Sequence, residues 1–204
     1  VMMQPVIIGG GAAGLMAACL LARAGVKCVI LEKQNRVGRK LLSTGNGRCN
    51  LSNENMDASF YGKAGPFVKQ VFSVTPPEEV LSFFSGLGLM TASEDGRIYP
   101  RTMMASSVLD VLRAGCEREN VTLLTGEEAL SVTQSRRGGW SVQLANGEGV
   151  FAPIVICAMG GKAAPHLGTD GSHLLLDKSI GQLKIRNARH GFRTDIAHDV
   201  SSCL

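Results

Sequence analysis

The first residues with spacing that could do chemistry are glycines near the start of the chain. Gly9–Gly14 has the pattern G-x-G-x-x-G. In that pattern the first glycine permits a sharp turn, the second lets an anion approach the backbone, and the third lets a helix pack closely on a sheet. Backbone N–H groups at a helix start attract phosphate, aided by the helix dipole. The segment predicts a diphosphate-binding turn made by the backbone of Gly9, Gly10, Gly11, Ala12, Ala13 and Gly14.

An acidic side chain completes this pattern. Glu32 lies 18 residues after Gly14. Dinucleotide-binding folds place an acid for the ribose hydroxyls about 20 residues after the glycine motif. A carboxylate there would repel a 2′-phosphate, which disfavours NADP in this site. The alternative is a glycine-rich turn with an ordinary surface glutamate. The agreement of pattern, context and acid favours the nucleotide site.

The surrounding sequence supplies the elements that such a site needs. Residues 6–8 form a continuous apolar run typical of a strand buried on both faces. Residues 12–24 are rich in strong helix formers, with Gly25 as a stop, and residues 26–31 predict a second strand. Strand, helix and strand in roughly thirty residues make a right-handed βαβ unit.

The remainder alternates helices with an antiparallel β region. Residues 32–55 are polar and basic, and we expect mostly loop. Expected helices cover 67–72, 77–85, 105–119 and 172–180, and expected strands cover 96–100, 121–124, 129–134, 140–144, 149–151 and 154–158. Asn146-Gly147 is a strong hairpin signal. We predict an α/β fold: a Rossmann-type three-layer dinucleotide-binding domain with a parallel sheet and an inserted antiparallel β-meander.

Two features favour FAD over NAD as the dinucleotide. The loop after Glu32 is long and basic, whereas a simple NAD domain passes quickly into its next helix. The β-meander that leads into residues 155–161 is typical of flavoproteins with two dinucleotide sites. An NAD-dependent dehydrogenase and a non-catalytic dinucleotide-binding module remain the alternatives. Bound flavin colour would separate them.

The chain resembles the HI0933-like (BaiN-like) family of FAD-dependent flavoproteins. The resemblance rests on residues 9–14, 32–33, 38–53, 96–100 and 158–161, and the Arg-Lys-Leu and Gly-Arg-Cys-Asn segments within 38–53 are the most specific. It implies non-covalent FAD with its ring near residues 38–53, NADH or NADPH as electron donor, and an FAD domain built from both ends of a longer chain. Some relatives reduce carbon–carbon double bonds in sterol-like acids.

From this resemblance we expect residues 1–181 to be the N-terminal portion of the FAD-binding domain. Residues 182–204 would be an irregular tail or the start of an inserted domain. The chain would then be the FAD-binding part of an oxidoreductase, or a truncated, inactive product. Met159 stands where threonine is more usual in the family.

Further cofactor contacts are expected outside the glycine turn. Arg39 and Lys40 could neutralise phosphate, although a solvated basic loop is the alternative. Asn46, Gly47 and Asn50 could bind the ring or ribityl chain, although ordinary turn chemistry explains them equally well. Cys49 is expected beside FAD without a chemical role, since no second cysteine lies nearby. The resemblance adds Lys33, Glu128, Ala129, Ala158, Met159 and Gly160.

Other function classes find little support. A net charge of +4 and 5% aromatic residues argue against nucleic-acid binding. The histidines and cysteines lack metal-ligand spacing, and scattered cysteines with no visible signal peptide fit the cytoplasm. The apolar stretch at 15–24 is too short to cross a membrane. The sequence names no catalytic acid or base, no substrate and no oligomeric state.

Overall fold

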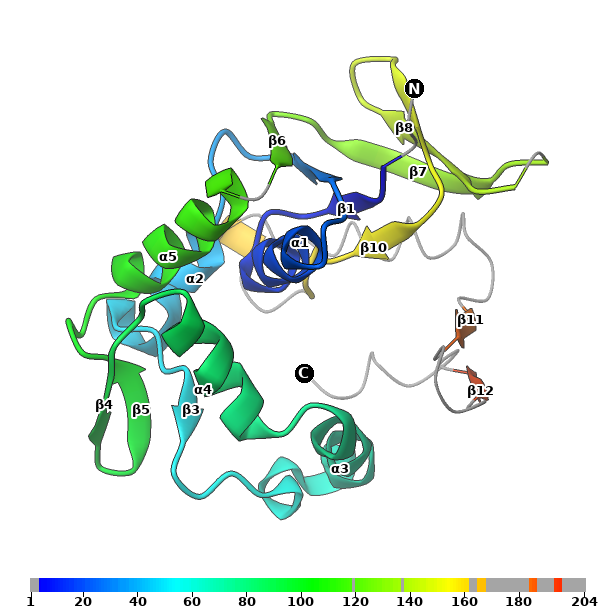
Figure 1. Cartoon of the computed structure of the whole chain (residues 1–204). Coiled ribbons are helices and arrows are strands. Elements are labelled where there is room, and N and C mark those ends of the chain that lie inside the picture. The colour runs from blue at the N-terminus through cyan, green and yellow to red at the C-terminus, as the bar shows by residue number, and fades with distance from the viewer. Residues whose placement is uncertain are drawn as a thin grey trace. The chain divides into compact units, whose positions relative to one another are not determined.

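The computed structural model of the chain describes residues 4–118, 120–136, 138–161, 165–167, 184–186 and 193–195. The chain divides into two compact units, one formed by Val1–Val37 with Glu119–Leu204 and the other by Gly38–Arg118. Figure 1 shows their elements in chain order. The expected helix at 172–180 and the expected boundary at 181/182 lie outside the described residues.

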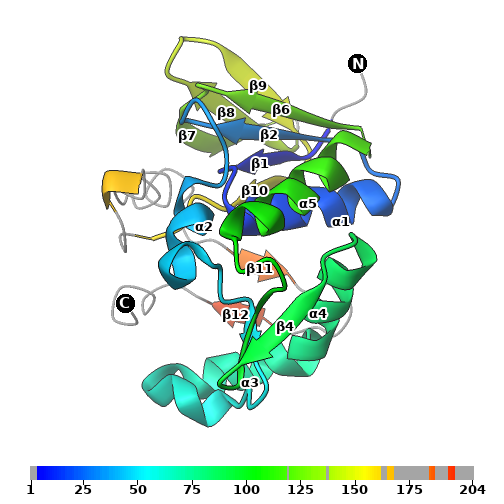
Figure 2. The same ribbon diagram turned by 90° about the vertical axis from the view of Figure 1, so that its left-hand side faces the viewer.

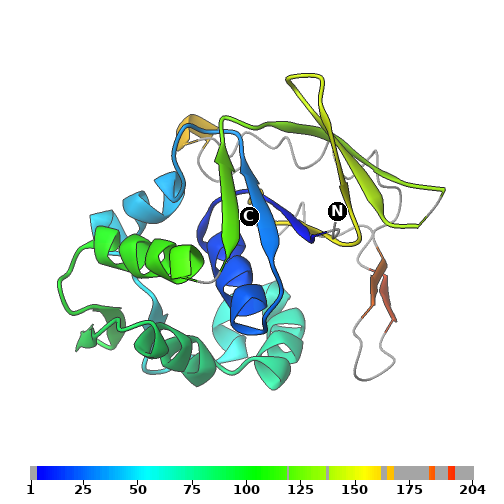
Figure 3. The same ribbon diagram turned by 45° about the horizontal axis from the view of Figure 1, so that its top comes forward.

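A parallel sheet forms the centre of the first unit. Its described strands run in the order β10-β1-β2-β6, comprising β10 (Val155–Cys157), β1 (Val6–Ile8), β2 (Cys28–Glu32) and β6 (Val121–Thr125). All neighbours are parallel, and β2 and β6 run side by side in Figure 3. Strands β2 and β6 lie on one side of β1, and the later strand β10 lies on the other, so the strand order reverses between β1 and β10. Sheets of this kind bind ligands at the carboxyl ends of the strands at such a switch point.

Helix α1 (Ala12–Arg23) covers one face of this sheet. The opposite face carries the antiparallel meander of β7 (Ala129–Gln134), β8 (Trp140–Leu144) and β9 (Gly149–Ala152). Figure 2 shows helix, sheet and meander as successive layers. The arrangement confirms the predicted α/β class with a parallel sheet and a β-meander.

Alternation along β1 explains both layers. Ile7 lies on the face of α1, since its Cγ2 is 3.3 Å from where a Cβ on Gly14 would stand. Val6 and Ile8 join a buried cluster with Val132 and Val142 of the meander. Full burial of an aliphatic side chain of this size stabilises a fold by about 1.5–3 kcal/mol. The short strand is therefore anchored from both sides.

The second unit combines short helices with a small antiparallel sheet. Its sheet order is β3-β5-β4, from β3 (Ser52–Asn53), β5 (Arg97–Pro100) and β4 (Thr91–Glu94). Its helical elements are α2 (Arg39–Ser43), η1 (Thr44–Gly47), η2 (Ala58–Ala64), α3 (Gly65–Val74), α4 (Pro77–Gly86) and α5 (Ala105–Arg118).

Three of the second unit's helices confirm predictions, and one segment corrects them. The helices expected near 67–72, 77–85 and 105–119 are α3, α4 and α5. The expectation that residues 32–55 are mostly loop was wrong in its middle, where α2, η1 and β3 form. A tertiary contact explains α2: a Cβ on Gly38 would stand 2.5 Å from a methyl carbon of Leu109, so the helix start lies directly on α5.

Three short segments complete the described structure. Residues 165–167 form the 3-10 turn η3 (Pro165–Leu167). Strands β11 (Lys184–Arg186) and β12 (Arg193–Asp195) pair antiparallel within the segment expected as an irregular tail or the start of an inserted domain.

Candidate functional site

The glycine turn joins β1 to α1 by close backbone contacts. Gly9 has a φ of +107°, a conformation that L side chains rarely adopt, and its N–H donates to the Leu31 carbonyl at 2.8 Å. A Cβ on Gly14 would overlap the carbonyl oxygen of Gly9. Glycine is therefore required at the first and third positions of the pattern for geometric reasons.

The middle of the turn leaves space where the outer glycines do not. Gly11 is the N-cap of α1, with an extended backbone (φ −81°, ψ −172°). A Cβ on Gly11 would meet no atom within 4 Å among the residues that the structure describes. Ala12 and Ala13 are exposed beside it. The described first turn contains no acidic residue and no side-chain cap.

This open helix start fits a diphosphate. The first N–H groups of a helix have no partners within the helix, and the helix dipole makes them attractive to an anion. An acid in the first turn would have competed for these donors. The free volume at Gly11 lies where an approaching phosphate would need it.

Glu32 turns back toward the glycine turn from the end of β2. Its Oε2 accepts a hydrogen bond from the Gly10 N–H at 2.7 Å, and its Oε1 accepts from the Gln34 N–H at 2.8 Å. Both bonds use backbone donors, so the carboxylate is held in one orientation. A carboxylate offers about four lone-pair sites, so acceptor capacity remains for sugar hydroxyls. Lys33, next to Glu32, is half-buried.

The end of β10 closes the switch point on the other side of β1. The Ala158 N–H donates to the Ile8 carbonyl at 2.8 Å, and the Ala158 carbonyl oxygen lies 2.6 Å from where a Cβ on Gly9 would stand. Gly160 follows with a φ of +75°. Met159 packs against the core cluster under the meander. The Met159 side chain is thus an apolar anchor for this turn.

The loop after β6 forms backbone hydrogen bonds with Glu32 and Gln34. The Glu127 N–H donates to the Glu32 carbonyl, and the Gly126 N–H donates to the Gln34 carbonyl, each at 3.0 Å. Glu128 then pairs with the meander, since its carbonyl accepts from the Ala145 N–H at 2.9 Å. Ala129 begins β7 beside a register shift. These backbone hydrogen bonds were not predicted from the sequence, although Gly126 directly after a parallel strand was the available signal.

The other predicted contacts belong to the second unit. Arg39 and Lys40 open α2 and are half-buried. Asn46, Gly47 and Asn50 are exposed in and after η1. The predicted contacts in the glycine turn, at Glu32, at Glu128 and in residues 158–160 belong to the first unit.

The segment from Thr44 to Asn50 has an unusual backbone. Gly45, Asn46, Gly47 and Cys49 all have positive φ. A residue other than glycine in this region costs about 1–3 kcal/mol and keeps that conformation only when its surroundings impose it. A Cβ on Gly45 would stand 2.7 Å from the Asn50 nitrogen, so the loop also folds tightly on itself.

Cys49 is buried at the end of this loop, with an exposed fraction of 7%. Burial raises the pKa of its thiol, and a hydrogen bond with Thr44 acts in the opposite direction but less strongly. A raised pKa disfavours the thiolate that redox or nucleophilic chemistry needs. The thiol is therefore suited to packing.

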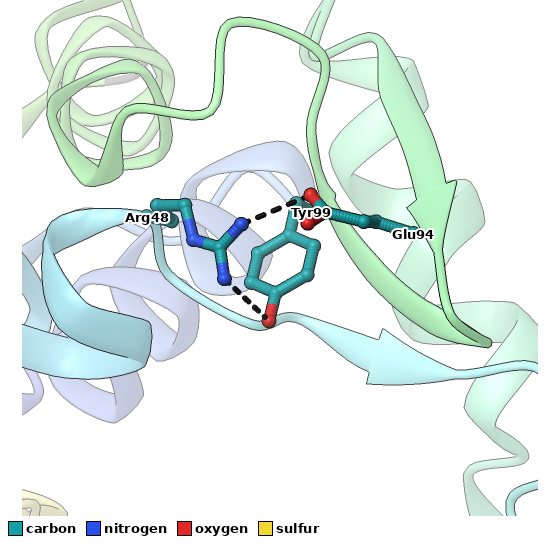
Figure 4. Close-up of polar contacts among 3 residues, drawn as sticks. All are labelled: Arg48, Glu94 and Tyr99. Atoms are coloured by element: carbon teal, nitrogen blue, oxygen red, sulfur yellow. Dashed lines mark hydrogen bonds and ion pairs between the residues drawn. The ribbon is translucent and has the colours of Figure 1, made fainter.

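Arg48 has partners on two strands of the same unit. Its Nη1 lies 2.9 Å from Oε2 of Glu94, its Nη2 lies 3.5 Å from the hydroxyl of Tyr99, and its guanidinium carbon lies 4.5 Å from the centre of the Tyr99 ring. Figure 4 shows the three side chains. We call them the Arg48 clamp. From the sequence alone, Arg48 was only one of several basic residues in this loop.

The comparison with protein families supplies the deciding observation. The family described as HI0933-like protein Rossmann domain matches residues 3–191. The chain belongs to this family. The resemblance expected from the sequence is therefore confirmed.

Two curated relatives extend the comparison. This HI0933-like chain is 44% identical over 178 residues to a 3-dehydro-bile acid delta(4,6)-reductase of Clostridium scindens, covering 86% of the chain and 43% of the relative. It is 30% identical over 165 residues to a ribosomal RNA dihydrouridine synthase of Escherichia coli, covering 80% of the chain and 40% of the relative. The chain thus spans less than half the length of these relatives.

A solved structure supports the fold. The chain is similar to THI4 from Thermovibrio ammonificans, with a TM-score of 0.54, 15% identity, and coverage of 79% of this chain and 58% of that one. In the part of the chain that the structure describes, no helix is long and apolar enough to span a membrane. Nor do three or more metal-binding side chains gather within the described ranges.

Proposed function

We propose that this HI0933-like chain is the FAD-binding Rossmann part of an FAD-dependent oxidoreductase. The observation that carries the proposal is the open start of α1. Free volume at Gly11 and a helix start without an acid lie beside a carboxylate fixed on the Gly10 N–H. Such a surface suits a diphosphate with an adjoining ribose.

Several segments of the chain would contact different groups of the cofactor. Residues 9–14 would bind the diphosphate and Glu32 the adenosine ribose, with residues 128–129 beside the adenine and 158–160 beside the turn. Arg39, Lys40, Asn46, Gly47 and Asn50 would contact the flavin half. FAD supplies hydride transfer, which no amino-acid side chain provides, and the protein contributes binding, orientation and exclusion of water.

The names of the relatives favour a reductase that acts on carbon–carbon double bonds. The Clostridium scindens relative is named as a delta(4,6)-reductase of a 3-dehydro-bile acid. The Escherichia coli relative is named as a dihydrouridine synthase, and dihydrouridine is uridine with one double bond saturated. A nicotinamide would be the electron donor. The donor and substrate class are tested by anaerobic bleaching of the flavin with NADH or NADPH, followed by reoxidation with candidate substrates.

The binding proposal is tested by Gly11→Ala. Because Gly11 has a negative φ and room for a methyl group, the variant should unfold like the wild type. The methyl group would occupy the space that the diphosphate needs, so FAD affinity should fall on the order of tenfold or more. FAD binding is measured by quenching of flavin fluorescence, with NAD as competitor.

A matched control comes from the meander. Gly149 also lacks a positive φ, and a Cβ there would find its nearest neighbour at 3.9 Å. Gly149→Ala should leave both stability and FAD affinity unchanged. Equal FAD affinity in Gly11→Ala and wild type would reject the site, and a chain that binds NAD but not FAD would reject the cofactor.

A further inference from the structure

The Thr44–Asn50 loop holds its left-handed backbone by contacts at both ends. The Arg48 N–H donates to the Gly45 carbonyl at 3.1 Å, and the Cys49 N–H donates to the Thr44 carbonyl at 3.0 Å. Next to the loop, the Leu51 N–H donates to the Ile98 carbonyl at 2.8 Å, which ties the chain to β5. The bond between Arg48 and Gly45 closes the turn around Asn46 and Gly47, and the bond to Ile98 ties the end of the loop to β5.

The Arg48 clamp adds side-chain contacts on the same strands. Tyr99 lies on β5 and is buried, so its ring is a fixed platform. One edge of this ring is 3.5 Å from where a Cβ on Gly45 would stand, and the guanidinium of Arg48 lies 4.5 Å from its centre. The Tyr99 ring therefore lies next to both Gly45, the first residue of the loop with a positive φ, and the side chain of Arg48.

The contacts of the clamp differ in strength. The ion pair between Arg48 and Glu94 joins side chains that are 37% and 48% exposed, and such pairs are weak and screened by salt. The 3.5 Å contact with the Tyr99 hydroxyl is at the limit for a hydrogen bond. The cation–π contact, in which the guanidinium carbon lies 4.5 Å from the centre of the buried Tyr99 ring, is the contact least affected by solvent.

We infer that Arg48 is a positioning residue for the flavin: its stacking on Tyr99 holds the Thr44–Asn50 loop in the form that offers Asn46 and Asn50 to bound FAD. The role toward FAD rests on the proposed function, whereas the contacts of the Arg48 clamp are observed in the structure. It differs from direct binding of a cofactor phosphate by Arg48, a role for which positive charge alone would suffice.

Arg48→Lys separates these two roles. Lysine keeps the positive charge and can still pair with Glu94, but it lacks the planar group that stacks on the ring. If Arg48 positions the loop, hydrogen exchange of the amides in residues 44–50 should speed up about tenfold, equivalent to about 1.4 kcal/mol. FAD affinity should fall severalfold and the visible flavin band should change shape, while ADP affinity stays unchanged.

Three further variants refine the test. Tyr99→Phe keeps the ring and should resemble the wild type in every measurement. Glu94→Gln removes only the exposed ion pair and should have a smaller effect than Arg48→Lys. Arg113→Met is the matched control, because Arg113 makes a similar exposed pair with Glu117 at 3.9 Å on α5 of the same unit. It should leave loop exchange and FAD binding unchanged.

The outcomes distinguish this inference from the proposed function. Unchanged loop exchange in Arg48→Lys would overturn the clamp, even if the chain binds FAD. Faster exchange with unchanged FAD affinity and spectrum would overturn the role toward the flavin. If the wild type binds no FAD, the proposed function fails, whereas hydrogen exchange still decides whether the clamp orders the loop.

Discussion

Glu32 accepts a 2.7 Å hydrogen bond from the backbone N–H of Gly10, so the acid proposed for the ribose also orders the turn proposed for the diphosphate. A side chain on Gly10 would disturb this pair. Its Cβ would stand 2.5 Å from Cγ1 of Val37 and 3.2 Å from Oε2 of Glu32. The two halves of the proposed nucleotide site are therefore one structural unit, and a change in either half should be felt in the other.

Glu32→Gln should both destabilise the chain and weaken FAD binding. Glutamine has one carbonyl oxygen, whereas Glu32 accepts from two backbone N–H groups, so one donor would face the amide NH2. Leaving such a half-buried donor unsatisfied costs about 1–3 kcal/mol. Urea denaturation measures this loss, and FAD titration should show affinity reduced about tenfold or more.

Glu127→Gln is the control for this substitution. Oε2 of Glu127 accepts a hydrogen bond from the side-chain amide of Asn146 at 3.0 Å in an exposed position, and the carbonyl oxygen of a glutamine can accept it equally well. Stability and FAD affinity should stay near those of the wild type. If Glu32→Gln behaves like Glu127→Gln in both measurements, Glu32 does not hold the turn.

Gly14→Ala should damage the fold itself. A methyl group at Gly14 would overlap the Gly9 carbonyl oxygen, and this neighbour is backbone that cannot move aside. Overpacking of this kind typically costs about 1–3 kcal/mol and can cost more. Urea or thermal denaturation should show the loss without any ligand.

A comparison with Gly11→Ala shows whether the overlap with the Gly9 carbonyl causes the loss of stability in Gly14→Ala. Both variants add one methyl group to the same turn, but only the Gly14 variant should lose stability in the absence of FAD. Equal stability of the two variants would mean that α1 does not pack on the Gly9 carbonyl as closely as the structure has it.

Local sequence patterns predicted the first unit well. The glycine turn, the apolar run at residues 6–8 and the helix-forming run after Gly11 each impose their structure over a few residues. The hairpin at Asn146-Gly147 is likewise local: Gly147 has a φ of +89°, and the Asn146 side chain accepts from the Glu148 N–H at 2.8 Å. Where a few neighbouring residues determine the backbone, the sequence alone predicts it.

The second unit depends on contacts that such patterns cannot show. Helix α2 has only five residues, too few for a periodic apolar face, and its start is fixed by the contact between Gly38 and Leu109. In the Arg48 clamp, Glu94 lies 46 positions and Tyr99 lies 51 positions after Arg48 in the sequence. No motif marks these pairings, so only the fold brings the residues together.

Cys49 should react slowly with iodoacetamide, despite its place in the Thr44–Asn50 loop. Burial raises the pKa of its thiol, and alkylation requires the thiolate. At pH 7–8 the exposed Cys157 should be modified first, and the rate at Cys49 should rise only well above the usual thiol pKa of about 8.5. Timed labelling followed by peptide mass spectrometry measures both rates in one sample.

The same pKa shift fixes the sign of a pH effect on stability. Because the folded chain keeps Cys49 protonated while the unfolded chain ionises it near pH 8.5, the stabilisation is complete below that pH and is lost as pH rises through the folded-state pKa. Cys28, whose pKa burial also raises, acts in the same direction, so Cys49→Ala should reduce this alkaline loss without abolishing it. Alkylation of Cys49 as fast as that of Cys157 at pH 7 would instead reveal a stabilised thiolate and make a redox role at this position worth testing.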